Sequence, residues 1–103
     1  MEYRMIKSPS RGTLDMLLRR KSSPATVPIV NYDAIGLIQG RLIDMVFAAD
    51  IAEKAAGVVV EDIKGHCPQN LIMIAVFGDT AAVEAAINQI KEKLSGAKKG
   101  EEL

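Results

Sequence analysis

The chain has 103 residues, enough for one domain with one modest core. Thirteen basic residues balance thirteen acidic ones, so the formal net charge is zero. This balance excludes the excess of Lys and Arg with which a general nucleic-acid binder neutralises phosphates. It also leaves self-association unopposed by long-range repulsion between copies.

The cysteine content and the ends of the chain limit the cellular setting. Cys67 is the only cysteine, so no disulfide can form within the chain, and its free thiol suits a reducing compartment. Residues 1–7 lack the apolar run of a signal peptide. No stretch approaches the roughly 20 apolar residues that span a bilayer. We therefore expect a protein of the cytosol with no membrane partner.

The first third of the chain predicts a strand, a helix and a connector. Residues 2–7 alternate in part between apolar and polar side chains, which favours a short strand. A helix follows, ending in cations that suit its negative pole, and its leucines recur at helical spacing: Leu14, Leu17 and Leu18. Two prolines lie within residues 21–31, which we interpret as an exposed connector.

The middle of the chain predicts two strands around a helix. Residues 32–39 are compatible with a strand, and residues 41–56 predict a helix that Gly57 ends. The buried stripe of this helix is expected to comprise Leu42, Ile43, Val46, Phe47, Ala49 and Ile51. Residues 58–63 open with three β-branched valines and predict the next strand.

The last third predicts a strand, a helix and a tail. Residues 71–77 form the longest apolar run and predict a buried strand. Residues 78–80 supply a turn with N-cap candidates before a helix over residues 81–94. Residues 97–103 are expected to be a disordered polar tail, and residues 1–96 a single domain. The order strand–helix–strand–helix–strand–strand–helix indicates an α/β or α+β fold with helices covering a mixed sheet.

Three fragments carry a family resemblance. Residues 34–38 read Ala-Ile-Gly-Leu-Ile, residues 48–58 read Ala-Ala-Asp-Ile-Ala-Glu-Lys-Ala-Ala-Gly-Val, and Gly78-Asp79 precedes Ala-Val-Glu-Ala-Ala at 82–86. In this order and spacing they resemble the bacterial microcompartment (BMC) shell domain. The resemblance implies a ferredoxin-like α+β sandwich and a structural subunit, not an enzyme. It also implies a homo-hexamer that tiles with other shell proteins in a microcompartment shell within the cytoplasm.

The N-terminal segment resembles a pattern that ordinary shell proteins carry at their C-terminus. Residues 5–10, Met-Ile-Lys-Ser-Pro-Ser, precede the leucines of the first predicted helix. The resemblance therefore implies a circularly permuted domain, in which residues 21–31 join the former ends. Ser8 departs from the family, whose ordinary members have an arginine there that contacts a neighbour's edge. Lys54 occupies the place of a lysine that the family uses at the hexamer edge.

The segment between the last two predicted strands narrows the resemblance. Gly65-His66-Cys67-Pro68-Gln69 matches the G-x-C-P-Q motif of the GrpU-like shell proteins of glycyl-radical propanediol microcompartments. That likeness implies an iron–sulfur cluster, of the 4Fe–4S type, at the pore of the hexamer. Cys67 would be the thiolate ligand. Gly65, Pro68 and Gln69 would shape the pore loop, and His66 occupies the variable position.

The number of thiolates that a cluster needs can be compared with the one cysteine per chain, independently of the resemblance. Such clusters take about four thiolates, so one cysteine per chain is too few, whereas a cyclic hexamer brings six around one axis. Three alternate thiolates would hold three irons and leave the fourth to a small exogenous ligand. Gly65 would give the backbone freedom and Pro68 would stiffen the loop. A cluster at a pore is exposed to oxidants and is expected to be labile in air.

Several alternatives remain open. A lone cysteine in a cytosolic domain is more often an inert thiol than a ligand, and zinc held by Cys67 and His66 of several copies would lack the usual C-x-x-C spacing. Lys54 could be a solvated helix residue. We interpret Asp50 and Glu53 as solvated or pairing residues, not catalytic acids.

Glu61 and Asp62 precede the predicted pore loop and have no assigned role. No acid, base and nucleophile can be assembled into a catalytic site, which argues against an enzyme. The competing function is a small ferredoxin-like regulatory or ligand-binding module without metal. Whether a pore would carry electrons, metabolites or a cluster for delivery stays undecided.

Overall fold

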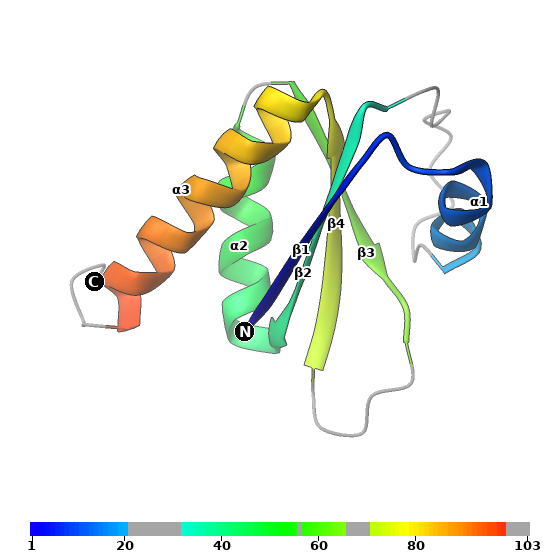
Figure 1. The fold of residues 1–103 in the computed structure, drawn as a ribbon. Helices are drawn as coiled ribbons and strands as arrows, with labels where there is room; N and C mark the ends of the chain where they lie inside the picture. The colour runs from blue at the N-terminus through cyan, green and yellow to red at the C-terminus, as the bar shows by residue number, and fades with distance from the viewer. Residues whose placement is uncertain (21–31, 56, 66–70, 99–103) are drawn as a thin grey trace.

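A computed structural model describes residues 1–20, 32–55, 57–65 and 71–98 of the chain. The predicted order of strands and helices is confirmed (Figure 1). In chain order the elements are β1 (Glu2–Lys7), α1 (Arg11–Arg20), β2 (Ala34–Arg41), α2 (Leu42–Lys54), β3 (Val58–Ile63), β4 (Leu71–Gly78) and α3 (Thr80–Lys98). The predicted connector, residues 21–31, lies outside the described residues. None of the helices described is both long and apolar enough to cross a membrane.

The four strands form one sheet in the order β1-β2-β4-β3, and every neighbouring pair is antiparallel. The expectation of a mixed sheet is therefore wrong. β2 and β3 do run in the same direction, as the helix between them requires, but β4 lies between them and separates the two. α2 and α3 cover one face of the sheet, and α1 stands alone on the other face (Figure 1).

Each face of the sheet has its own apolar cluster because successive side chains of a strand point to opposite faces. The larger cluster lies between the sheet and the two helices α2 and α3, and includes Ile38, Met45, Val76 and Ile90. The smaller cluster lies beneath α1 and is built around Phe77, whose ring centroid is 5.6 Å from that of Tyr32. Leu17 is the one side chain of α1 that is fully buried.

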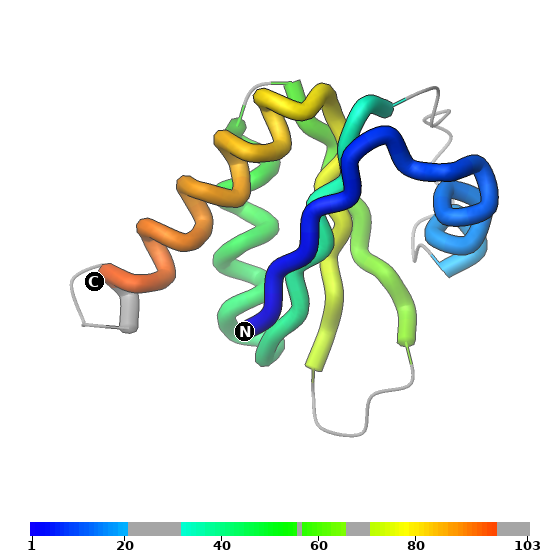
Figure 2. The backbone as a smooth tube through the Cα atoms, in the orientation of Figure 1, coloured from blue at the N-terminus to red at the C-terminus, as the bar shows by residue number. Residues whose placement is uncertain are grey.

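The chain start and the last turns of α3 lie close together, because Met1, Leu94 and Ser95 line one small cleft. Figure 2 traces the path from β1 at the sheet edge to α3. Placed after α3, β1 would complete the β-α-β-β-α-β order of a ferredoxin-like sandwich. The structure therefore has the permuted arrangement that the sequence predicted.

The buried stripe of α2 differs from the predicted one. Its buried residues are Met45, Ala48, Ile51 and Ala52, whereas Leu42, Ile43 and Val46 are 54%, 70% and 62% exposed. Ile51 is buried and Phe47 and Ala49 are partly buried, as expected. Apolar residues occur all around this helix, so their spacing does not fix which side faces the sheet. The rotation follows from the packing of the buried residues of α2 against the sheet and α3.

The ends of α2 and α3 show how local residues bound the helices. Asp79 is the N-cap of α3, since its Oδ1 accepts a hydrogen bond from the Ala82 amide at 2.7 Å. α2 ends at Lys54, and Gly57 follows with a positive φ of 81°. α3 continues to Lys98, past the predicted end at Leu94 and two residues into the predicted tail, and residues 99–103 lie outside the described part.

The close approach of β4 and the turn before β3 gives a testable stability difference between two glycines. A Cβ on Gly78 would lie 2.7 Å from the Gly57 carbonyl oxygen, which is backbone and cannot rotate away, whereas a Cβ on Gly12 in α1 would meet nothing within 4 Å. We expect Gly78→Ala to lower the free energy of unfolding by about 1–3 kcal/mol. Gly12→Ala should instead raise it by about 0.5–1 kcal/mol. Urea unfolding of both variants tests this; an equal effect at the two sites would contradict the close contact.

Candidate pore-loop site

The predicted pore loop leaves the sheet between β3 and β4. Ile63 near the end of β3 pairs with Met73 of β4, and Lys64 and Gly65 lead out of the sheet. The Lys64 amide donates a hydrogen bond to the Arg20 carbonyl at 2.6 Å, which ties the end of α1 to this exit. His66, Cys67, Pro68 and Gln69 lie outside the described residues, so their assignment stays a prediction.

Gly65 is the one motif residue that the structure describes. Among the described residues, a Cβ there would meet nothing within 4 Å, and Gly65 does not have a positive φ. The predicted role of Gly65 in giving the loop backbone freedom stays a prediction.

An exposed apolar surface lies at the same end of the molecule. Arg41 pairs with Leu71, so α2 begins beside the start of β4. The side chains of Leu42, Ile43 and Val46, which we call the α2 patch, are more than half exposed. Three large aliphatic side chains are thus exposed together on the first turns of one helix, and a contiguous exposed apolar surface is a candidate for association.

The opposite face of the sheet carries a groove beside α1. Its volume is about 770 Å³, and it opens where the sheet extends beyond the cover that α1 provides. The groove is lined by apolar sheet residues and by cations at its rim, including Leu37, Leu71, Met73, Arg19, Arg20 and Lys64. From the sequence we interpreted the cations at the end of this helix, which include Arg19 and Arg20, only as partners of the helix dipole. That they flank a groove depends on where α1 docks, which no local pattern indicates.

The far end of α2 holds the predicted hexamer-edge residue. Lys54 Nζ lies 2.8 Å from Asp50 Oδ2, and both side chains are largely exposed. Asp50 is thus a pairing partner, one of the two roles expected for it, and Glu53 is exposed beside it. The pair is a solvent-exposed i,i+4 ion pair worth only about 0.3–0.5 kcal/mol. The role of Lys54 at an edge remains a prediction.

The two acidic residues that precede the loop have different surroundings. Glu61 is 7% exposed and faces the same side of the sheet as Phe77, whereas Asp62 is exposed and lines the groove. Within the described ranges, no group of three or more His, Cys, Asp or Glu side chains could hold a metal ion. Ser8, the departure from the family pattern, follows β1 with a φ of 50°.

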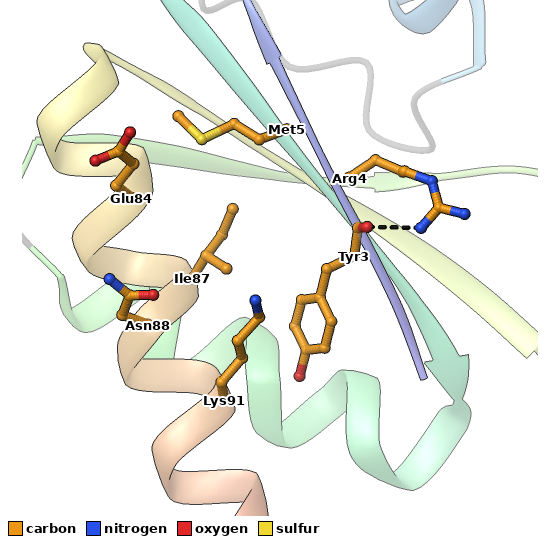
Figure 3. A pocket seen from close by; sticks show the side chains of 7 residues that line it. All are labelled: Tyr3, Arg4, Met5, Glu84, Ile87, Asn88 and Lys91. Carbon is orange, nitrogen blue, oxygen red and sulfur yellow. Dashed lines mark hydrogen bonds between the residues drawn. The ribbon is translucent and has the colours of Figure 1, made fainter.

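A second, smaller cleft of about 270 Å³ separates β1 from α3 (Figure 3). Met5 and Ile87 contribute its apolar lining, and Lys91 Nζ lies 4.8 Å from the centroid of the Tyr3 ring. Partial burial, with a smaller effect from the Asp44 charge, raises the pKa of Tyr3. The Tyr3 hydroxyl therefore stays protonated at neutral pH, and it donates a hydrogen bond to Met1 Sδ at 2.9 Å.

Comparison with known proteins shows which family the chain is similar to. The BMC domain family model matches residues 34–102, which is most of the chain. The chain belongs to the BMC domain family. It is 55% identical to the GrpU microcompartment shell protein from Clostridiales bacterium 1_7_47FAA, whose ligand-free structure matches with a TM-score of 0.73 over 92% of this chain and 93% of that one.

A second GrpU microcompartment shell protein, from Pectobacterium wasabiae, is 41% identical. Its ligand-free structure matches with a TM-score of 0.70 over 87% of this chain and 99% of that chain. No curated protein matches the chain. The predicted resemblance to GrpU-like shell proteins is confirmed.

These findings decide between the two functions that the sequence left open. The protein is a structural BMC shell subunit, not an enzyme, and its place is the microcompartment shell in the bacterial cytoplasm. The family model begins at Ala34, at the start of β2, so β1 and α1 precede the matched region as a permuted order requires. BMC shell proteins assemble with other shell proteins, which is the setting for the exposed surfaces described above.

Proposed function

We propose that six copies of this BMC subunit form a ring and that the segments between β3 and β4 meet at its axis. There, Cys67 thiolates would hold an iron–sulfur cluster of the 4Fe–4S type. The observation that carries the ring is the position of the α2 patch. Leu42, Ile43 and Val46 are exposed in the single chain and lie at the end of the molecule where Lys64 and Gly65 leave the sheet. A ring that buries the patch draws the six segments together.

The donor set fits a cluster only in such a ring. Iron–sulfur clusters take about four thiolates, and each chain has one cysteine. Rotational symmetry around one axis multiplies that single sulfur, as a cyclic oligomer multiplies every residue near its axis. Three alternate Cys67 thiolates would be ligands, which leaves one iron for a small exogenous ligand. The GrpU-like motif around Cys67 supports the assignment.

The other motif residues would position the thiolate. Pro68 restricts the backbone next to Cys67 and lowers the entropy lost when the loop is fixed. Backbone amides of the loop would donate hydrogen bonds to the cluster sulfurs and so adjust its potential. When bound, the cluster would supply one-electron transfer across the shell. As alternatives to electron transfer, the pore would let small metabolites pass, or the ring would deliver a cluster to an enclosed enzyme.

The first test is the mass of the assembly. Native mass spectrometry or light scattering should give about 67 kDa, six times the 11.1 kDa chain mass. Anaerobic reconstitution with iron and sulfide should then give a brown protein with about four irons per six chains. A monomer or dimer at micromolar concentration would overturn the ring, and a colourless hexamer without iron would overturn the cluster. The colour should fade on exposure to air.

A further inference from the structure

Two unpartnered surfaces lie on opposite faces of the sheet, and they differ in shape. α2 and α3 cover one face of the sheet, and α1 lies on the other (Figure 1). The α2 patch projects on the side of α2 and α3, whereas the groove lies beside α1. Both lie at the end where β3 and β4 meet the predicted pore loop, since Leu71 borders the groove and pairs with the residue that precedes Leu42.

The chemistry of the two surfaces is complementary along their length. The outward face of α2 begins with the aliphatic α2 patch and continues with two exposed carboxylates, Asp50, which pairs with Lys54, and Glu53. The groove has a half-exposed apolar floor formed by strand residues, and its charged lining has one carboxylate, Asp62, against three cations, Arg19, Arg20 and Lys64. Aliphatic side chains would therefore meet the apolar floor, and carboxylates would meet guanidinium groups.

We propose that the α2 patch of one copy docks in the groove beside α1 of the next copy. This pairing rests on the proposed ring and names the surfaces that build it. A contact between two different surfaces on opposite faces is heterologous, and such contacts close into a ring when the rotation between neighbouring copies divides a full turn. An isologous dimer would instead bring the same face of both copies together. Because the patch and the groove lie on opposite faces, one of them would then remain uncovered.

The loose attachment of α1 fits the same pairing. Leu17 is the only side chain of α1 that is fully buried, and Met16 on the groove side is 45% exposed. A helix with so little burial in its own chain gains stability from a partner that covers its exposed apolar side. The hydrogen bond that the Lys64 amide donates to the Arg20 carbonyl would then link the covered α1 to the start of the predicted pore loop.

Disulfide capture tests which surfaces meet. In a Cys67→Ser background, a chain with both Met16→Cys and Val46→Cys should give a ladder of up to six linked chains after mild oxidation. Each single variant should stay monomeric on a denaturing gel, because a heterologous contact pairs position 16 only with position 46. A chain with Met16→Cys and Gln89→Cys, the latter on the exposed side of α3, is the matched control and should give no ladder.

Charge reversal tests the same contact without a new bond. Arg19→Glu with Arg20→Glu, or Asp50→Lys with Glu53→Lys, should each raise the concentration for half-assembly about tenfold or more. Both surfaces lie on one chain, so all four substitutions together should restore assembly. A wild-type ring without the ladder and without this rescue would overturn the pairing and leave the proposed function standing. A wild-type chain that forms no ring would overturn both.

Discussion

Replacing Ile43 and Val46 together by Asp should abolish the ring. These side chains are 70% and 62% exposed in the single chain, so the substitution leaves its own core untouched. Burying two carboxylates against an apolar surface without partners costs several kcal/mol at each contact. Six equivalent contacts would each lose this energy. Size-exclusion chromatography with light scattering should give the monomer mass at micromolar concentration.

Gln89→Asp provides the control for this experiment. It introduces the same charge at an exposed position of α3, outside both surfaces of the proposed contact, and should keep the hexamer mass. Circular dichroism should show that the monomeric double variant remains folded, because the buried residues of α2, among them Met45, Ala48 and Ala52, are unchanged. A double variant that stays hexameric would exclude the α2 patch from the interface.

Replacing Cys67 by Ser should remove the iron while leaving the ring intact. Serine keeps nearly the same volume but offers no thiolate, the ligand that these clusters require. After anaerobic reconstitution, the variant should lack the visible absorbance and bound iron of the wild type, and its native mass should be unchanged. His66→Ala is the matched control. We expect it to bind as much iron as the wild type, because His66 occupies the variable position of the motif.

These two variants separate the remaining alternatives. Equal iron in Cys67→Ser and the wild type would show that the thiol is not the ligand. Loss of metal in both Cys67→Ser and His66→Ala, with zinc in place of iron in the wild type, would favour the mixed cysteine and histidine site. A wild type that binds neither metal would leave Cys67 an inert thiol.

Most of the secondary structure could be predicted because local signals agreed with each other. The apolar run at 71–77 and the Asp79 cap together define β4 and the start of α3, and the structure confirms both. The three valines of β3 and the positive φ of Gly57 likewise follow from side-chain and backbone preferences that act within a few residues.

The wrong predictions concern features that are decided by contacts between residues far apart in the sequence. Apolar residues occur on every side of α2, so the sequence could not show that Ile43 and Val46 face outward. The prediction of a mixed sheet was wrong because the directions of the strands do not show that β4 lies between β2 and β3. The role of Arg19 and Arg20 at the groove was missed because it depends on the docking of α1. All three follow from tertiary arrangement, which periodicity does not encode.

The most direct measurement is an electron cryomicroscopy structure of the assembly prepared and reconstituted without oxygen. We expect a closed ring of six chains with the α2 patch covered and with density for a cluster where the Cys67 sulfurs converge on the rotation axis. A ring in which Cys67 lies far from every rotation axis, or an assembly that leaves Ile43 and Val46 exposed to solvent, would contradict this account.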